Sequence, residues 1–117
     1  MTTQTLSRLH IDLETYCELD LSKVGVYAYA SHPSFEILLF AYAYDDEPAR
    51  IIDMTSENLP DQVLNVLTDE AVIKVAHNAV FEMICLENYL MLEIDPHQWE
   101  DTMVMAMQQG LPASLAQ

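Results

Sequence analysis

Residues 9–15, with the sequence LHIDLET, alternate strictly between apolar and polar side chains. This two-residue period is typical of a β-strand with one face turned toward a core. Residues two apart on a strand share a face and lie roughly 7 Å apart, so Asp12 and Glu14 are expected to point in the same direction. The two carboxylates repel each other unless a cation lies between them. The pattern therefore fits either a half-solvated strand with a polar outer face or one side of a cation site.

A second segment, residues 76–82 with the sequence AHNAVFE, brings another carboxylate into apolar surroundings. Asn78 and Glu82 are four residues apart and are expected to share one face of a helix, about 6 Å apart along its axis. A carboxylate inside a buried helix costs several kcal/mol unless a cation or hydrogen bonds compensate. Glu82 is thus expected either on a wet stripe shared with Asn78 or in a functional cleft.

The charge of the chain is strongly unbalanced. Its 117 residues, enough for one domain, carry 19 acidic and four basic side chains, a formal net charge of −15. Such a chain repels the nucleic-acid backbone unless cations intervene. This balance argues against a plain nucleic-acid-binding module and favours cation binding.

The two cysteines, Cys17 and Cys85, form no metal-binding or redox spacing and are expected to be free thiols in a reducing cytoplasm. No apolar run reaches the roughly 20 residues needed to cross a bilayer. The first residues lack the apolar core of a signal peptide. We therefore expect a cytoplasmic protein with no membrane partner, in the cytoplasm of a bacterial host if a phage or prophage encodes it.

The remaining pattern predicts an α/β fold, a mixed sheet with helices packed on it. After the first strand, the pattern predicts a long connection with a short extended piece at 26–30, and then strands at 35–44 and 49–54. A helix starting at Thr55 and running to about 67, a strand at 72–76 and a helix at 78–92 are expected to follow. The last predicted elements are a short strand near Trp99 and a helix capped by Asp101 or Thr102 and running to Gln109. The first three strands form an antiparallel meander, and later strands add in parallel. A crevice is expected at the carboxyl ends of the central strands.

Several of these segments resemble one family. Residues 11–15, IDLET, match the first motif Asp-x-Glu-Thr of the proofreading 3′–5′ exonucleases of the DEDD superfamily, and residues 78–82, NAVFE, look like their second motif, Asn-x-x-aromatic-Asp. The segments VGVYAYA (24–30), HPSFEIL (32–38) and GLPASL (110–115) resemble the exonuclease domain of phage-type family A DNA polymerases. The resemblance implies a ribonuclease H-like fold, truncated at the C-terminus.

The resemblance also implies a chemistry. Such a domain hydrolyses the terminal phosphodiester at the 3′ end of single-stranded DNA with two divalent ions, Mg²⁺ or Mn²⁺, held by hard carboxylate oxygens. By resemblance, Asp12 would bridge both metals, Glu14 would hold one and orient the water, and Glu82 would take the role of the second-motif acid. Thr15 and Asn78 would position the terminal nucleotide.

Two departures from the family pattern shape the expectation. The second-motif acid is Glu82 where the family usually has Asp, and no residue matches the third motif, which is expected beyond Gln117. Residues 1–117 are therefore interpreted as an incomplete exonuclease-like domain with weak or absent activity, followed by a polymerase domain if the native chain is longer. A helix cut short at Ser114 to Ala116 would expose apolar surface and favour a homodimer.

Three alternatives stay open from the sequence. An acidic protein can imitate the charge of DNA and bind a DNA-processing enzyme without chemistry. A metal-binding fold can also keep its shape after losing its reaction. Finally, the residues do not separate DNA from RNA as the substrate.

Overall fold

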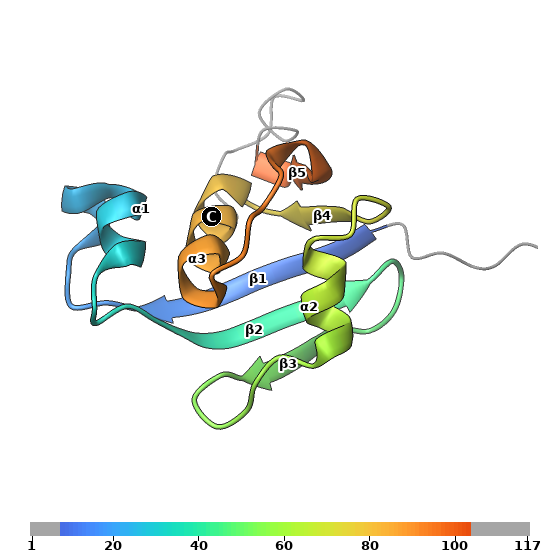
Figure 1. Ribbon diagram of the computed structural model, residues 1–117, viewed down its shortest axis with the longest axis horizontal. Coiled ribbons are helices and arrows are strands. Elements are labelled where there is room, and N and C mark those ends of the chain that lie inside the picture. The colour runs from blue at the N-terminus through green and yellow to red at the C-terminus, as the bar shows by residue number, and fades with distance from the viewer. Residues whose placement is uncertain (1–7, 104–117) are drawn as a thin grey trace, which may run out of the picture.

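The computed structural model describes residues 8–103, which form a five-stranded sheet with three α-helices and a short 3₁₀ helix (Figure 1). The elements in chain order are β1 (Arg8–Tyr16), α1 (Leu21–Ser31), β2 (Glu36–Tyr44), β3 (Arg50–Asp53), α2 (Asp61–Leu67), β4 (Ile73–Ala76), α3 (Ala79–Leu90), η1 (Pro96–Gln98) and β5 (Trp99–Asp101). The predicted α/β class is confirmed.

The sheet has the strand order β3-β2-β1-β4-β5, with β1 at its centre. β1 pairs antiparallel with β2, and β2 with β3, so the predicted meander is confirmed. β4 pairs parallel with β1 only along residues 8–10, and β5 continues in parallel beside β4. Because β4 pairs only with the first residues of β1, β4 does not cover the same edge along the second half of β1. Another element can contact β1 there.

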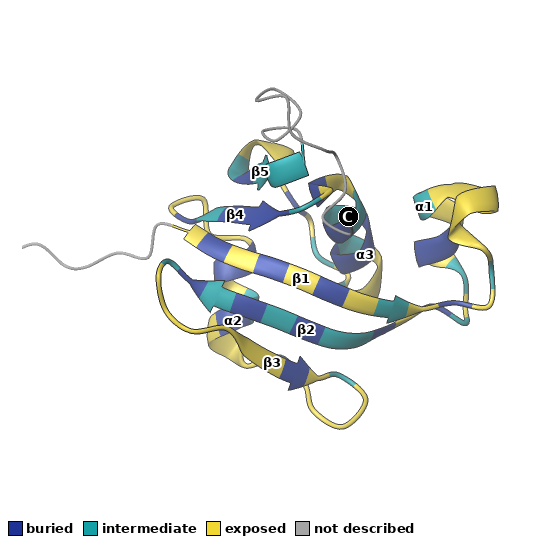
Figure 2. Cartoon of the chain, turned by 180° about the vertical axis from the view of Figure 1, so that it is seen from behind, coloured by how far each residue is buried: buried dark blue, intermediate teal, exposed yellow. Residues whose placement is uncertain are grey.

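The two faces of the sheet differ in cover. Helices α2 and α3 lie on one face, and the view from behind shows the opposite face without a helix from the described part of the chain (Figures 1 and 2). Along β1 the burial alternates, with Leu9, Ile11 and Leu13 in the core and the polar residues between them exposed. The period-two pattern of the sequence therefore placed the carboxylates of β1 on the open face.

Helix α1 corrects the sequence prediction. Residues 16–25 were expected to be a connection and 26–30 an extended piece, but residues 21–31 are helical. Asp20 caps the helix by accepting a hydrogen bond from the backbone N–H of Ser22 at 3.0 Å. At Gly25 the chain has φ 83° and ψ 165°, so the helix is broken there into two short turns. This glycine, with the two valines at 24 and 26 and the tyrosine at 27, gives the segment a low helix propensity, so the sequence did not predict the helix. Contacts with α3 stabilise it.

Other boundaries shift by a few residues. Helix α2 begins after Pro60 and not at Thr55, because Asp53 instead accepts hydrogen bonds from Thr55 and holds residues 53–56 in a turn. The last strand is β5, directly after η1. Helical backbone begins at Thr102, while the rest of the predicted last helix, its stop at Gly110 and the segment at 114–116 lie outside the described residues.

A buried lysine ties the loops at one end of the sheet together. Lys74 on β4 is 0% exposed, and its ammonium group donates hydrogen bonds to the backbone oxygens of Asp69 and Val72 and to Oε1 of Gln98, at 2.7, 2.9 and 3.0 Å. Burial lowers the pKa of this ammonium group, and the negative charges of Asp69 and Asp95 oppose that shift. The lysine therefore fixes the turn before β4 against η1.

Candidate active site

The first two predicted site residues lie where the sequence placed them. Asp12 and Glu14 are exposed on the open face of β1, opposite Ala41 and Leu39 of β2. The pairing with β2 shifts register between Glu14 and Thr15, so the strand is irregular directly after the second carboxylate. Irregularities of this kind re-aim side chains and are frequent beside active sites.

Glu82 comes from α3 to the same strand. The Glu82 side chain is only 4% exposed, and its carboxyl accepts a hydrogen bond from the backbone N–H of Leu13. Burial, and after it the negative charge of Asp12, raise the pKa of Glu82 from an ordinary 4.5 to about 8. The carboxyls of Glu82 and Asp12, seventy residues apart in sequence, are therefore close enough to interact electrostatically. This corrects the alternative in which Glu82 lies on a solvated stripe.

Asn78 departs from its predicted position on a helical face shared with Glu82. It precedes α3 as the capping residue, in the left-handed conformation with φ 65° and ψ 61°, and it is exposed while Glu82 is buried. Its side chain makes no capping hydrogen bond. The side-chain amide of Asn78 is therefore exposed at the surface beside the start of α3 and can contact a ligand there.

Thr15 is held in place by α1. Its Oγ1 lies 2.9 Å from the hydroxyl of Tyr29, and the Tyr29 ring is buried between Phe35 and Phe81 with centroid distances of 5.5 and 6.2 Å. Phe81 directly precedes Glu82. The helix missed in the sequence thus connects the end of the first motif with the second.

Asp101, at the end of β5, also lies beside the start of α3. Its carboxylate accepts hydrogen bonds from the backbone N–H groups of Asn78, Ala79 and Met103, at 2.9, 3.0 and 2.9 Å. The bond to Met103 confirms the predicted cap of the helical turn that starts at Thr102. The bonds to the start of α3 had no sequence signal, since they depend on the parallel pairing of β4 and β5. The negative charge of Asp101 also contributes to the raised pKa of Glu82.

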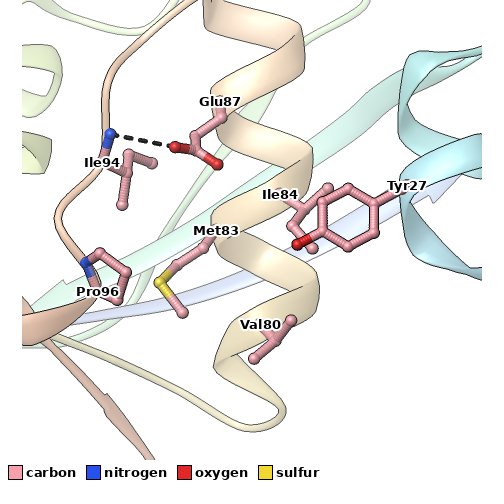
Figure 3. Close-up of a pocket in the computed structure, with 7 residues that line it drawn as sticks. All are labelled: Tyr27, Val80, Met83, Ile84, Glu87, Ile94 and Pro96. Carbon is pink, nitrogen blue, oxygen red and sulfur yellow. Dashed lines mark hydrogen bonds between the residues drawn. The ribbon is translucent and has the colours of Figure 1, made fainter.

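Two hollows border these elements. One, of about 250 Å³, lies on the open face of the sheet beside Asp12 and is lined also by His10, Ala41, Ala43 and Ala49. The other, of about 220 Å³, runs along the surface of α3 and is lined by Val80, Met83, Ile84 and Glu87 of α3, by Tyr27 of α1 and by Ile94 and Pro96 (Figure 3). The first belongs to the candidate site, whereas the second lies on a different side of α3 from Glu82.

The carboxylates do not form a ready-made metal centre. Within residues 8–103, no three His, Cys, Asp or Glu side chains are placed so that they could hold one metal ion. In the same part of the chain both cysteines are free and buried, and no helix has the length and apolar character needed to span a membrane. The donors are of the hard oxygen type that Mg²⁺ and Mn²⁺ prefer.

The chain is similar to known proteins in sequence and in fold. No protein-family model matches the chain. The DNA polymerase of Bacillus phage SP02 is 50% identical over 111 residues, which is 94% of this chain and 17% of the polymerase. The chain thus spans about a sixth of the length of this relative.

Solved structures share the fold. Escherichia coli RNase D, an exoribonuclease involved in structured RNA processing, matches with a TM-score of 0.66 at 17% identity, covering 95% of this chain and 26% of RNase D. Brucella melitensis NrnC bound to pGG matches with 0.63 at 16% identity, over 87% of this chain and 44% of NrnC. The exonuclease domain of EXD2, soaked in Mn and GMP, matches with 0.56 at 18% identity, over 88% and 47%. The chain has the ribonuclease H-like fold of the DEDD 3′–5′ exonucleases. Within this fold, residues 11–15 lie on β1 and residues 78–82 lie at the start of α3.

Proposed function

We propose that this chain is a 3′–5′ exonuclease domain of a DNA polymerase, hydrolysing the terminal phosphodiester of single-stranded DNA. The observation that supports this most strongly is the position of Glu82. Its carboxyl is buried, hydrogen-bonded to the backbone of Leu13, and close enough to Asp12 for the two carboxyls to repel each other. A buried carboxyl beside a second one is costly without a cation. The similarity to a phage DNA polymerase supports DNA as the proposed substrate.

The donor chemistry of the site fits divalent cations. Asp12, Glu14 and Glu82 would hold Mg²⁺ or Mn²⁺, which supply an activated water and neutralise charge on the phosphate. The same cations would let a chain of net charge −15 accept an anionic substrate. Thr15, held by Tyr29, and the exposed amide of Asn78 would orient the terminal nucleotide.

We further propose that the activity of this chain is weak. No closed group of three ligands is formed within the described residues, and Glu82 is one methylene longer than the aspartate usual at the second motif. A displaced or missing ligand costs orders of magnitude in rate. A polymerase domain and a second copy of the chain are the proposed protein partners.

Digestion of end-labelled single-stranded DNA tests the activity. With Mn²⁺ and enzyme in excess, we expect slow shortening from the 3′ end that Asp12→Ala abolishes. Asp53→Ala, which removes an acid at the end of the edge strand β3, is the matched control and should cleave like the wild type. Cleavage that survives Asp12→Ala would overturn the assignment, and fast cleavage would overturn the proposed weakness. A single-stranded RNA of the same sequence shows which polymer is preferred.

A non-catalytic mimic of DNA would behave differently. Its function would depend on the total negative charge and not on any one buried acid. Absence of cleavage, together with unchanged stability on addition of Mn²⁺, would favour that alternative.

A further inference from the structure

The carboxylate of Asp101 bridges three parts of the chain. It lies at the end of β5, and its two oxygens accept the backbone N–H groups of Asn78 and Ala79, which are 23 and 22 residues away. The same carboxylate accepts the N–H of Met103 in its own turn. An ordinary cap serves only the helix that it begins. Asp101 therefore does more than the sequence predicted for it.

The backbone that Asp101 holds is in an unfavourable conformation. Asn78 has φ 65° and ψ 61°, a left-handed geometry that asparagine adopts more readily than most residues but that still costs free energy relative to glycine. Its own side chain gives the helix no cap. Two successive N–H groups bound to one carboxylate fix the orientation of the peptide between them. The contact thus compensates the strain at residue 78.

The start of α3 sets the place of Glu82. Glu82 follows Asn78 by four residues, about one helical turn or 6 Å. If residue 78 relaxed into another backbone region, α3 would leave β4 in a different direction. The Glu82 carboxyl would then lose its hydrogen bond to Leu13 and its position beside Asp12.

We propose that Asp101 is a positioning residue of the active site, which holds Asn78 in its left-handed conformation and thereby places Glu82 beside Asp12. This role rests on the proposed metal site, because it is through metal binding that the position of Glu82 matters. Asp101 acts through the backbone, whereas a metal ligand would act through its own oxygen atoms.

Glycine at position 78 separates these two roles. Glycine adopts positive φ without strain, so the left-handed backbone at position 78 depends less on the carboxylate when glycine stands there. The variants are Asp101→Ala, the conservative Asp101→Asn, Asn78→Gly, and Asp101→Ala combined with Asn78→Gly. Asp53→Ala is the matched control, since it removes a carboxylate that also accepts a backbone N–H in a turn. Hydrogen exchange of the amides of residues 78 and 79 and titration with Mn²⁺ alone are the two readouts.

We expect Asp101→Ala to abolish protection of these two amides and to weaken Mn²⁺ binding about 10- to 100-fold. Asp101→Asn, with one acceptor oxygen in place of two, should fall between Asp101→Ala and the wild type. Addition of Asn78→Gly to Asp101→Ala should restore most of the Mn²⁺ affinity, and Asp53→Ala should change neither readout.

Three results would overturn the positioning role. These are unchanged protection of the amides in Asp101→Ala, lost protection with unchanged Mn²⁺ affinity, and lost affinity that glycine at position 78 does not restore. The last result would show that Asp101 does not act by compensating the left-handed conformation of residue 78. Failure of the wild type itself to bind Mn²⁺ would refute the proposed metal site, and with it the positioning role, while hydrogen exchange would still report whether Asp101 holds the start of α3.

Discussion

At the scale of single residues, the site depends on one carboxyl in apolar surroundings. Glu82 stands next to Phe81 and Met83 in a mostly apolar helix, and its environment raises its pKa to about 8. A sequence can show that such a residue is out of place, but whether it meets solvent or another acid depends on tertiary packing. In the structure Glu82 is buried and lies near Asp12.

The raised pKa gives a pH dependence in the metal-free protein. Unfolded Glu82 loses its proton near pH 4.5 and folded Glu82 near 8, so the folded state binds more protons in between and stability falls as pH rises. Each pH unit of this window corresponds to about 1.4 kcal/mol. In EDTA, thermal melts at pH 5 and pH 8 should show a larger loss for the wild type than for Glu82→Gln. Equal losses would mean that Glu82 is not perturbed by its surroundings.

Lys74 gives a second prediction at this scale. Lys74→Met would leave the backbone oxygens of Asp69 and Val72 and the Gln98 amide oxygen without their shared donor. We expect a loss of about 1–3 kcal/mol in the free energy of unfolding, measured by urea denaturation. Lys23→Met, on the exposed surface of α1, is the control and should change stability by less than about 0.5 kcal/mol. Similar losses in both variants would show that the three hydrogen bonds contribute little.

At the scale of elements, strands were easier to predict than helix α1. The alternation along β1 and the apolar run of β2 are local signals, and both strands formed at nearly the predicted bounds. Helix α1 has an unfavourable glycine and β-branched residues, and its stability comes from packing on α3 and from the contact of Tyr29 with Thr15. Such contacts are invisible in the sequence.

Gly25 tests the break in α1. Its φ of 83° and ψ of 165° lie in a region open essentially to glycine alone, and a Cβ built there meets no atom within 4 Å. Gly25→Ala should therefore destabilise the protein by about 1–3 kcal/mol through backbone strain and not through a clash. Ala28→Gly, in the exposed second turn of the same helix, is a comparison with an ordinary helical cost of about 1 kcal/mol. A fully stable Gly25→Ala variant would contradict this conformation.

At the scale of the whole molecule, the sheet order brings the two motifs together. The antiparallel meander and the parallel strands after it place β1 at the centre of the sheet. Because β4 pairs only with the first residues of β1, Glu82 can lie beside the rest of that strand. Asp12, Glu14 and Glu82 could be named from the sequence because their spacing resembles a known pair of motifs. Asp101 could not be assigned its contacts to α3, since these require the register of β5 beside β4.

Asp12 and Glu82 are proposed to bind a divalent cation together, and the melting temperature with and without Mn²⁺ tests this most directly. At pH 7.5, saturating Mn²⁺ should raise the melting temperature of the wild type by about 5 °C or more. The rise should disappear in Asp12→Asn and in Glu82→Gln and persist in Asp53→Asn. A rise of equal size in all four proteins would show that Mn²⁺ binds only to the general negative charge, and would contradict the site.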